Sequence, residues 1–172
     1  MKPFLRIFFI IFLLLSSIVK IFAQNNSELN FSYEEIEKRI DESHNSKENL
    51  WKWINLYIKK SKIANNSETI LYSYRYASKY SEYPINFKYA DSALIVARKT
   101  KNEKLLSYAY LNRGTLYMDE EKYNKALDDI LLANNYSNES KDNYTYNKTK
   151  YYVAQNKIYL GLYEDANTEL KS

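Results

Sequence analysis

The sequence predicts an all-α protein built from helix hairpins. Its 172 residues include only two glycines and two prolines, fewer turn-forming residues than strand-rich domains need. Apolar residues recur at helical spacing between short polar breaks, and no segment shows a convincing strand-like alternation. The segments also repeat: "LYSYRYASKYS" aligns with "SYAYLNRGTLY" at a shift of 107 − 71 = 36, and "YNKALDDIL" aligns with "YEDANTEL" at a shift of 163 − 123 = 40.

Residues 1–23 have the pattern of an export signal. Two positive charges in "MKPFLR" precede "IFFIIFLLLSSIV", an uncharged and largely apolar run, and Ala23 offers the residue before a cut. The run is shorter than the roughly 20 apolar residues of a membrane-spanning helix. A cleaved signal peptide is the first interpretation. An uncleaved anchor is the second, because Lys20 and Ile21 make the cleavage region imperfect. Either predicts an exported chain, periplasmic or facing the periplasm of a bacterium.

Charge and cysteine content exclude several classes of site. Without Lys2, Arg6 and Lys20 of the leader, the net charge falls from +4 to 4 − 3 = +1. Such a chain has no basic face that suggests direct binding of nucleic acid. The absence of cysteine excludes disulfides, a cysteine nucleophile, a thiolate metal site and a lipoprotein anchor.

The remaining elements follow in order along the chain. Residues 24–31 are a polar linker, and Ser32 with Glu35 forms the pattern of a capping box at the first helix. Pro84 suits the first position of a helix. Helical spacing predicts helices over 32–41, 50–64, 69–81, 85–100, 104–118, 122–136 and 144–160, with a last helix beginning within 161–172.

Gly114 stands out because it lies inside a predicted helix. A glycine there costs ~1 kcal/mol relative to alanine, so some other contact must require it. We expect Gly114 and Ala126 to lie where two helices cross most closely. We expect Gly161 to end a helix in the left-handed conformation.

The residues around Gly114 resemble the tetratricopeptide repeat, a helix–turn–helix unit of about 34 residues. From Ser107 onward, the small and aromatic residues of that repeat are matched by Tyr110, Gly114, Tyr117, Tyr123, Ala126, Ile130 and Ala133. The resemblance covers residues 67–172 well, and residues 32–66 only as a degenerate N-terminal helix pair. It implies a right-handed α-solenoid of about three units. The small residues that it assigns to helix packing are Ser78, Ala90, Ala97, Gly114, Ala126, Ala133, Ala154 and Ala166.

The resemblance also implies a concave, peptide-binding groove along the first helices of the hairpins. Its lining would be Tyr72, Arg75, Tyr76, Lys79, Tyr108, Leu111, Asn112, Thr115, Tyr151, Tyr152 and Gln155. Aromatic side chains with a few polar groups suit the capture of a peptide or a helix. The alternatives are a solvated surface, or a face covered by a further part of the protein itself.

More narrowly, the chain looks like the exported sensor halves of membrane-bound bacterial regulators, in which an AraC-like helix-turn-helix domain follows one transmembrane helix. That resemblance implies a protein or peptide ligand, and membrane contact only through an uncleaved leader or a missing C-terminal segment. We expect the array to be truncated at its C-terminus, since Leu170 would lack a following helix. The alternatives are a free-standing periplasmic scaffold or assembly factor, and an accessory domain of an enzyme.

No catalytic or metal site is predicted, and no cofactor. His44, the single histidine, lies in a polar break and is expected to be solvated. The acidic runs 119–121 and 128–129 fall in a turn and on the outer face of a helix, where carboxylates are usually solvated. No phosphate-binding glycine loop or catalytic triad is present. The sequence therefore predicts a non-enzymatic module.

Overall fold

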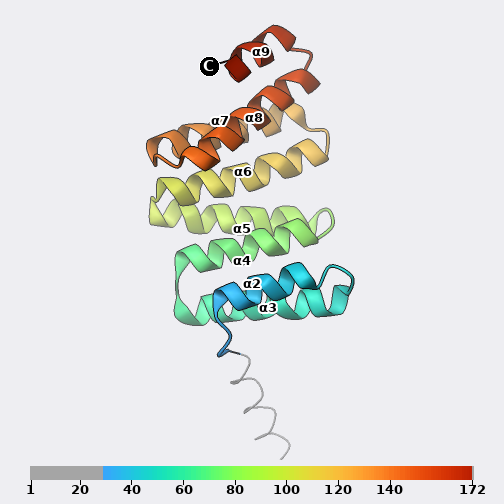
Figure 1. Cartoon of the computed structure of the whole chain (residues 1–172), viewed down its shortest axis with the longest axis vertical. Helices are drawn as coiled ribbons and strands as arrows, with labels where there is room; N and C mark the ends of the chain where they lie inside the picture. Colours follow the sequence, from blue (N-terminus) through green and yellow to red (C-terminus); the bar gives the residue numbers. More distant parts are fainter. Residues whose placement is uncertain (1–28, 172) are drawn as a thin grey trace, which may run out of the picture. The chain divides into compact units, whose positions relative to one another are not determined.

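A computed structural model describes residues 29–171, with Leu170 described only by its backbone. The predicted leader, most of the linker and the Leu170 side chain lie outside the described residues. Within 29–171 the protein is all-α and contains no strand (Figure 1). None of the helices there is long and apolar enough to cross a membrane. The helices are α2 Tyr33–Glu42, α3 Lys47–Ala64, α4 Ser67–Tyr80, α5 Ile85–Thr100, α6 Glu103–Asp119, α7 Tyr123–Glu139, α8 Asn143–Tyr159 and α9 Tyr163–Lys171.

The described residues divide into two compact units, one ending at Lys60 and the other beginning at Ser61, so the division lies within α3. In the first unit, the capping box predicted at α2 is confirmed. The Ser32 hydroxyl accepts from the Glu35 amide, and the Glu35 carboxylate accepts from the Ser32 amide. Helix α3 begins three residues before the expected position because the Ser46 hydroxyl accepts a hydrogen bond from the Asn49 amide at its first turn.

The second unit is a series of packed helix hairpins. Helix α4 packs on α5, α6 on α7, and α8 on α9, and each hairpin also packs on the next (Figure 1). The helix starts reproduce the two shifts seen in the sequence: 103 − 67 = 36 for α4 and α6, and 143 − 103 = 40 for α6 and α8. The first helices of successive hairpins are α4, α6 and α8, and α6 contacts both α4 and α8. We call these three the A helices.

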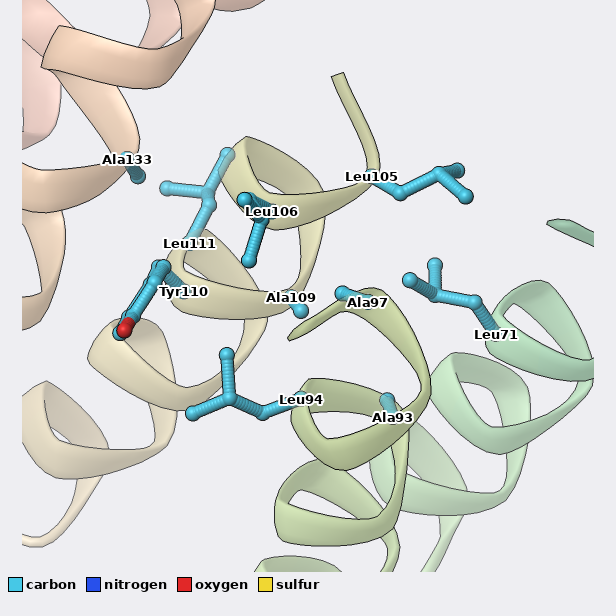
Figure 2. Close-up of a cluster of buried hydrophobic side chains, with 10 residues drawn as sticks. All are labelled: Leu71, Ala93, Leu94, Ala97, Leu105, Leu106, Ala109, Tyr110, Leu111 and Ala133. Atoms are coloured by element: carbon cyan, nitrogen blue, oxygen red, sulfur yellow. The ribbon is translucent and has the colours of Figure 1, made fainter. Parts of the chain in front are cut away.

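The core of the second unit forms where α4, α5, α6 and α7 meet. Figure 2 shows Leu71 of α4, Leu94 of α5 and Ala133 of α7 around the side chains of α6. The buried residues of α6 are spread over several of its sides, because α4, α5, α7 and α8 all pack against it. Five side chains of this cluster come from α6: Leu105, Leu106, Ala109, Tyr110 and Leu111.

All eight small residues assigned to helix packing are buried. The tightest contact is at Gly114, where a Cβ atom would lie 2.7 Å from Cγ1 of Ile130. It would also lie 3.4 Å from the carbonyl oxygen of Ala126 and 3.4 Å from Cβ of Asp129. Helices α6 and α7 therefore approach each other closely enough to require glycine, and this contact offsets the glycine's poor helix propensity.

Helices α6, α7 and α8 end in a repeated turn with one left-handed residue. Glu121, Lys141 and Gly161 have φ of 56°, 57° and 77°, and they recur at equal intervals along the chain (141 − 121 = 161 − 141). In each turn, the amide of the residue after the left-handed one donates a hydrogen bond to the carbonyl five residues earlier. For example, the Leu162 amide donates to the Lys157 carbonyl at 2.9 Å. This is the Schellman arrangement that commonly ends helices. Pro84, whose bond to Tyr83 is cis, precedes α5 by one residue instead of opening it.

These turns predict opposite effects of two substitutions. Gly161→Ala should lower the free energy of unfolding by about 1 kcal/mol, because alanine disfavours positive φ and nothing lies within 4 Å of the added Cβ. Glu121→Gly should raise it by about 0.5–1 kcal/mol for the converse reason. Urea unfolding followed by circular dichroism measures both. Equal effects of the same sign would contradict the turn geometry.

Candidate functional site

Two A helices bring two tyrosines and an arginine together. The rings of Tyr72 on α4 and Tyr108 on α6 lie with centroids 5.9 Å apart. The Arg75 guanidinium carbon lies 5.9 Å from the centroid of the Tyr72 ring and 5.2 Å from that of Tyr108. Both distances are typical of cation–π contacts. The two tyrosines are offset by 108 − 72 = 36, the shift between units, so they hold the same position in successive units. We call Tyr72, Arg75 and Tyr108 the tyrosine–arginine cluster.

The cluster is half-buried, and burial shifts the pKa of Tyr72. Burial raises the pKa of the Tyr72 phenol well above its usual range, and the nearby Tyr108 and Glu68 add to the shift while Arg75 opposes it. The phenol therefore stays protonated at physiological pH and donates to the Glu68 carboxylate at 3.3 Å. The cluster therefore combines two aromatic rings with the positive charges of Arg75 and Lys104 and the carboxylate of Glu68.

Asp142 extends the cluster to α8. The Tyr108 hydroxyl donates to the Asp142 carboxylate at 2.9 Å. The same carboxylate caps α8, accepting from the Thr145 amide at 3.1 Å and the Thr145 hydroxyl at 2.8 Å. Desolvation raises the pKa of Asp142, but the hydrogen bonds from Thr145 and Tyr108 and the charge of Lys104 outweigh it, so the net pKa is lowered. One carboxylate thus joins the tyrosine–arginine cluster to the next A helix.

The lowered pKa predicts a pH dependence of stability. A carboxyl whose pKa is lower in the folded state contributes stability above its unfolded pKa and loses it as the pH falls through the folded value. Asp142→Ala should therefore cost about 1–2 kcal/mol at neutral pH, as for a lost helix cap. The deficit should shrink below about pH 4, near the ordinary pKa of 3.8. Urea unfolding at a series of pH values measures this. A deficit independent of pH would contradict the assigned role.

Other residues predicted to line a groove are used in packing between helices. The Asn112 amide donates to the Ser78 hydroxyl at 3.3 Å and so links α6 to α4. Leu111 is only 5% exposed and belongs to the core cluster, so it adds little to any open surface. Thr115 donates to the Asn112 carbonyl within α6. The two hairpins therefore share a polar contact as well as the tyrosine–arginine cluster.

The groove residues predicted on α8 do not join the tyrosine–arginine cluster. Tyr152 is half-buried and packs against both core clusters, the one around α6 and the one formed by Ala126, Ile130 and Val153. Tyr151 is exposed and its ring contacts that of Tyr152 at 5.8 Å. Gln155 reaches the Tyr159 hydroxyl at 3.5 Å. On α4, Tyr76 is half-buried, and Lys79 is exposed with its ammonium over the Tyr80 ring.

The expectation that both aspartates of 128–129 are solvated is wrong for Asp129. Its side chain is buried and accepts two hydrogen bonds from Arg113, at 2.7 Å and 2.9 Å. Arg113 also reaches the exposed Asp91 on α5 at 3.0 Å. The bonds to Asp129 are the main reason that the pKa of Arg113 is raised. The ion pair ties α6 to α7 beside Gly114, and Asp128 remains exposed.

Sequence reasoning missed Asp142, Lys104 and the Arg113–Asp129 pair. Asp142 had a readable signal, an aspartate three residues before Thr145 at a helix start. The Arg113–Asp129 pair had none, because its members lie on different helices with a turn between them.

His44 is exposed in the turn between α2 and α3. Across residues 29–171, no three acidic, histidine or cysteine side chains gather where they could hold a metal ion. Models of known protein families give no match to the chain, and neither do curated proteins or solved structures.

Proposed function

We propose that residues 61–172 form a non-enzymatic module of the tetratricopeptide type that binds a protein or peptide along its A helices. The observation that carries the proposal is the tyrosine–arginine cluster. Equivalent tyrosines of successive units lie in contact with each other and with one arginine, and aromatic residues and arginine dominate the binding energy of protein interfaces. The repeated hairpins with small residues at their crossings support the further proposal of a right-handed α-solenoid.

Selection from a displayed peptide library, followed by fluorescence anisotropy with the selected peptides, tests this function. Arg75→Gln should weaken binding by about tenfold or more, because the guanidinium that contacts both rings is lost. Lys88→Gln is the matched control, since Lys88 is an exposed cation on α5, away from the A helices. Selected peptides that bind both variants equally well would place the binding surface elsewhere.

For the cellular role, we propose an exported sensor part of a membrane-bound transcriptional regulator. The apolar leader pattern and the resemblance of the Tyr-rich array to such sensor halves support it. A reporter gene regulated through the chain should respond to Arg75→Gln and not to Lys88→Gln. If the two variants leave transcription unchanged while Arg75→Gln releases a tightly bound periplasmic protein, the scaffold role replaces the sensor role.

A further inference from the structure

The two tyrosines of the tyrosine–arginine cluster direct their hydroxyl groups to different helices. The Tyr72 hydroxyl donates to Glu68, four residues earlier on the same helix, at 3.3 Å. The Tyr108 hydroxyl donates at 2.9 Å to Asp142, the residue that caps α8 in the next hairpin. Because the two tyrosines hold the same position in successive units, the difference must come from their surroundings.

The residue four positions before each tyrosine explains the difference. Before Tyr72 this residue is Glu68, whose carboxylate accepts the phenol proton. Before Tyr108 it is Lys104, whose ammonium lies 5.7 Å from the centroid of the Tyr108 ring. A protonated lysine has no acceptor, so Lys104 cannot replace Glu68 in this role. Asp142 of the next unit supplies the acceptor instead.

Asp142 also differs from the equivalent caps of the other A helices. The N-caps of α4, α6 and α8 are Asn66, Asn102 and Asp142, related by the two shifts between units (102 − 66 = 36 and 142 − 102 = 40). Both asparagines cap their helices with one amide oxygen. Asp142 uses Oδ1 in the same way, accepting from the Thr145 amide, and its Oδ2 atom accepts from the Thr145 and Tyr108 hydroxyls. The oxygen that holds Tyr108 is therefore not the one that caps the backbone.

We propose that Asp142 is a positioning residue for ligand binding, whose Oδ2 atom fixes the Tyr108 ring where the tyrosine–arginine cluster contacts a peptide. This inference rests on the proposed function of the A helices. A ring that is fixed before the peptide arrives loses little rotamer freedom on binding. The Arg75 guanidinium carbon lies 5.2 Å from the centroid of the same ring, so a ring that turns away also loses this contact. Asp142 needs no contact with the peptide.

Substitutions at residue 142 separate positioning from capping. Asp142→Ser keeps a capping oxygen for α8, but its shorter side chain has no second oxygen for the Tyr108 hydroxyl. It should weaken the binding of a peptide selected on the wild-type chain by about threefold to tenfold. Asp142→Asn keeps the shape of the side chain, and its amide can donate to the phenol oxygen, so it should weaken binding less. Fluorescence anisotropy measures both affinities, and circular dichroism shows whether both variants are folded.

Asn102→Ser is the matched control, because it places the same serine at the equivalent cap of α6. The Asn102 side chain accepts from the Leu105 amide, so the substitution leaves the hydrogen bond between Tyr108 and Asp142 in place. The affinity should not change. Equal losses from Asn102→Ser and Asp142→Ser would overturn the proposal, since any altered cap would then have the same effect. An Asp142→Asn variant that binds more weakly than Asp142→Ser would also overturn it.

A double-mutant cycle tests whether Asp142 acts through Tyr108. Tyr108→Phe removes the hydroxyl, keeps the ring and leaves the cap of α8 unchanged. It should weaken binding by about threefold to tenfold. Combined with Asp142→Ser, it should cost no more than the stronger of the two single substitutions, because both remove the same hydrogen bond. Strictly additive losses of binding free energy would show that Asp142 acts by another route.

Arg75→Gln separates this inference from the function on which it rests. If Arg75→Gln weakens binding of the selected peptide while Asp142→Ser and Tyr108→Phe bind it as the wild type does, the positioning role is wrong and the proposed function stands. If Arg75→Gln binds the peptide as the wild type does, or if no peptide can be selected, the proposed function fails and the positioning role fails with it.

Discussion

Gly114→Leu is expected to unfold residues 61–172 in one cooperative transition at lower temperature or urea than the wild type. The site has no room even for a methyl group, because a Cβ would lie 2.7 Å from Cγ1 of Ile130, a side chain that is itself fully buried. Gly114→Ala should already cost about 1–3 kcal/mol through overpacking, despite alanine's better helix propensity. Leucine adds three more carbon atoms to the same contact and should cost more. Thermal and urea unfolding measure both variants.

A double-mutant cycle distinguishes this contact from a general loss of stability. Ile130→Ala alone should cost about 2–5 kcal/mol because it leaves a cavity. Combined with Gly114→Ala it should cost less than the sum, since removing Cγ1 makes room for the new methyl group. Asn124→Leu, which places the same leucine side chain at an exposed position of α7, should change stability by less than about 0.5 kcal/mol. Strict additivity of the two alanine substitutions would show that Gly114 and Ile130 do not touch.

Asp129→Ala is expected to be the most destabilising single loss of a polar contact, by about 3–5 kcal/mol. The substitution leaves the Arg113 guanidinium partly buried with only the exposed Asp91 to pair with. Replacing both partners, as Arg113→Met with Asp129→Leu, should recover much of that loss, because two apolar side chains leave no unpaired charge. Urea unfolding of the three proteins gives the comparison.

An exposed pair provides the control for that prediction. Lys38 and Glu42 lie four residues apart on α2, with their side chains 76% and 58% exposed, and Glu42→Ala should change stability by less than about 0.5 kcal/mol. Equal losses from Asp129→Ala and Glu42→Ala would mean that burial of the Arg113–Asp129 pair has no energetic consequence.

The helices and their crossings could be read from the sequence because local signals determine them. Ser32 and Glu35 form their capping box within four residues, and the pattern needs no knowledge of the rest of the chain. Gly161 takes positive φ where a helix must end. Gly114 was informative for another reason: a costly residue inside a helix implies a compensating close contact, and the repeat spacing showed which helix makes it.

Contacts between hairpins were harder to predict because side-chain direction decides them. Leu111 and Tyr108 are three residues apart on α6, yet Leu111 is buried in the core and Tyr108 reaches Asp142 at the start of α8. Adjacent aspartates separate just as sharply, since Asp129 faces Arg113 and Asp128 faces water. A periodic pattern predicts the buried face of a helix only to within one or two residues. It therefore cannot decide which of two neighbouring side chains is buried and which is exposed.

The central claim is that the A helices carry the binding surface, and position-specific photo-crosslinking in the cells that make the protein tests it most directly. A photoreactive residue replaces exposed Lys79 on α4, one turn beyond Arg75, or exposed Ile95 on α5. We predict that Lys79 captures one dominant protein and that Ile95 captures it weakly or not at all. Capture of the same protein with equal yield from both positions, or capture from Ile95 alone, would contradict the claim.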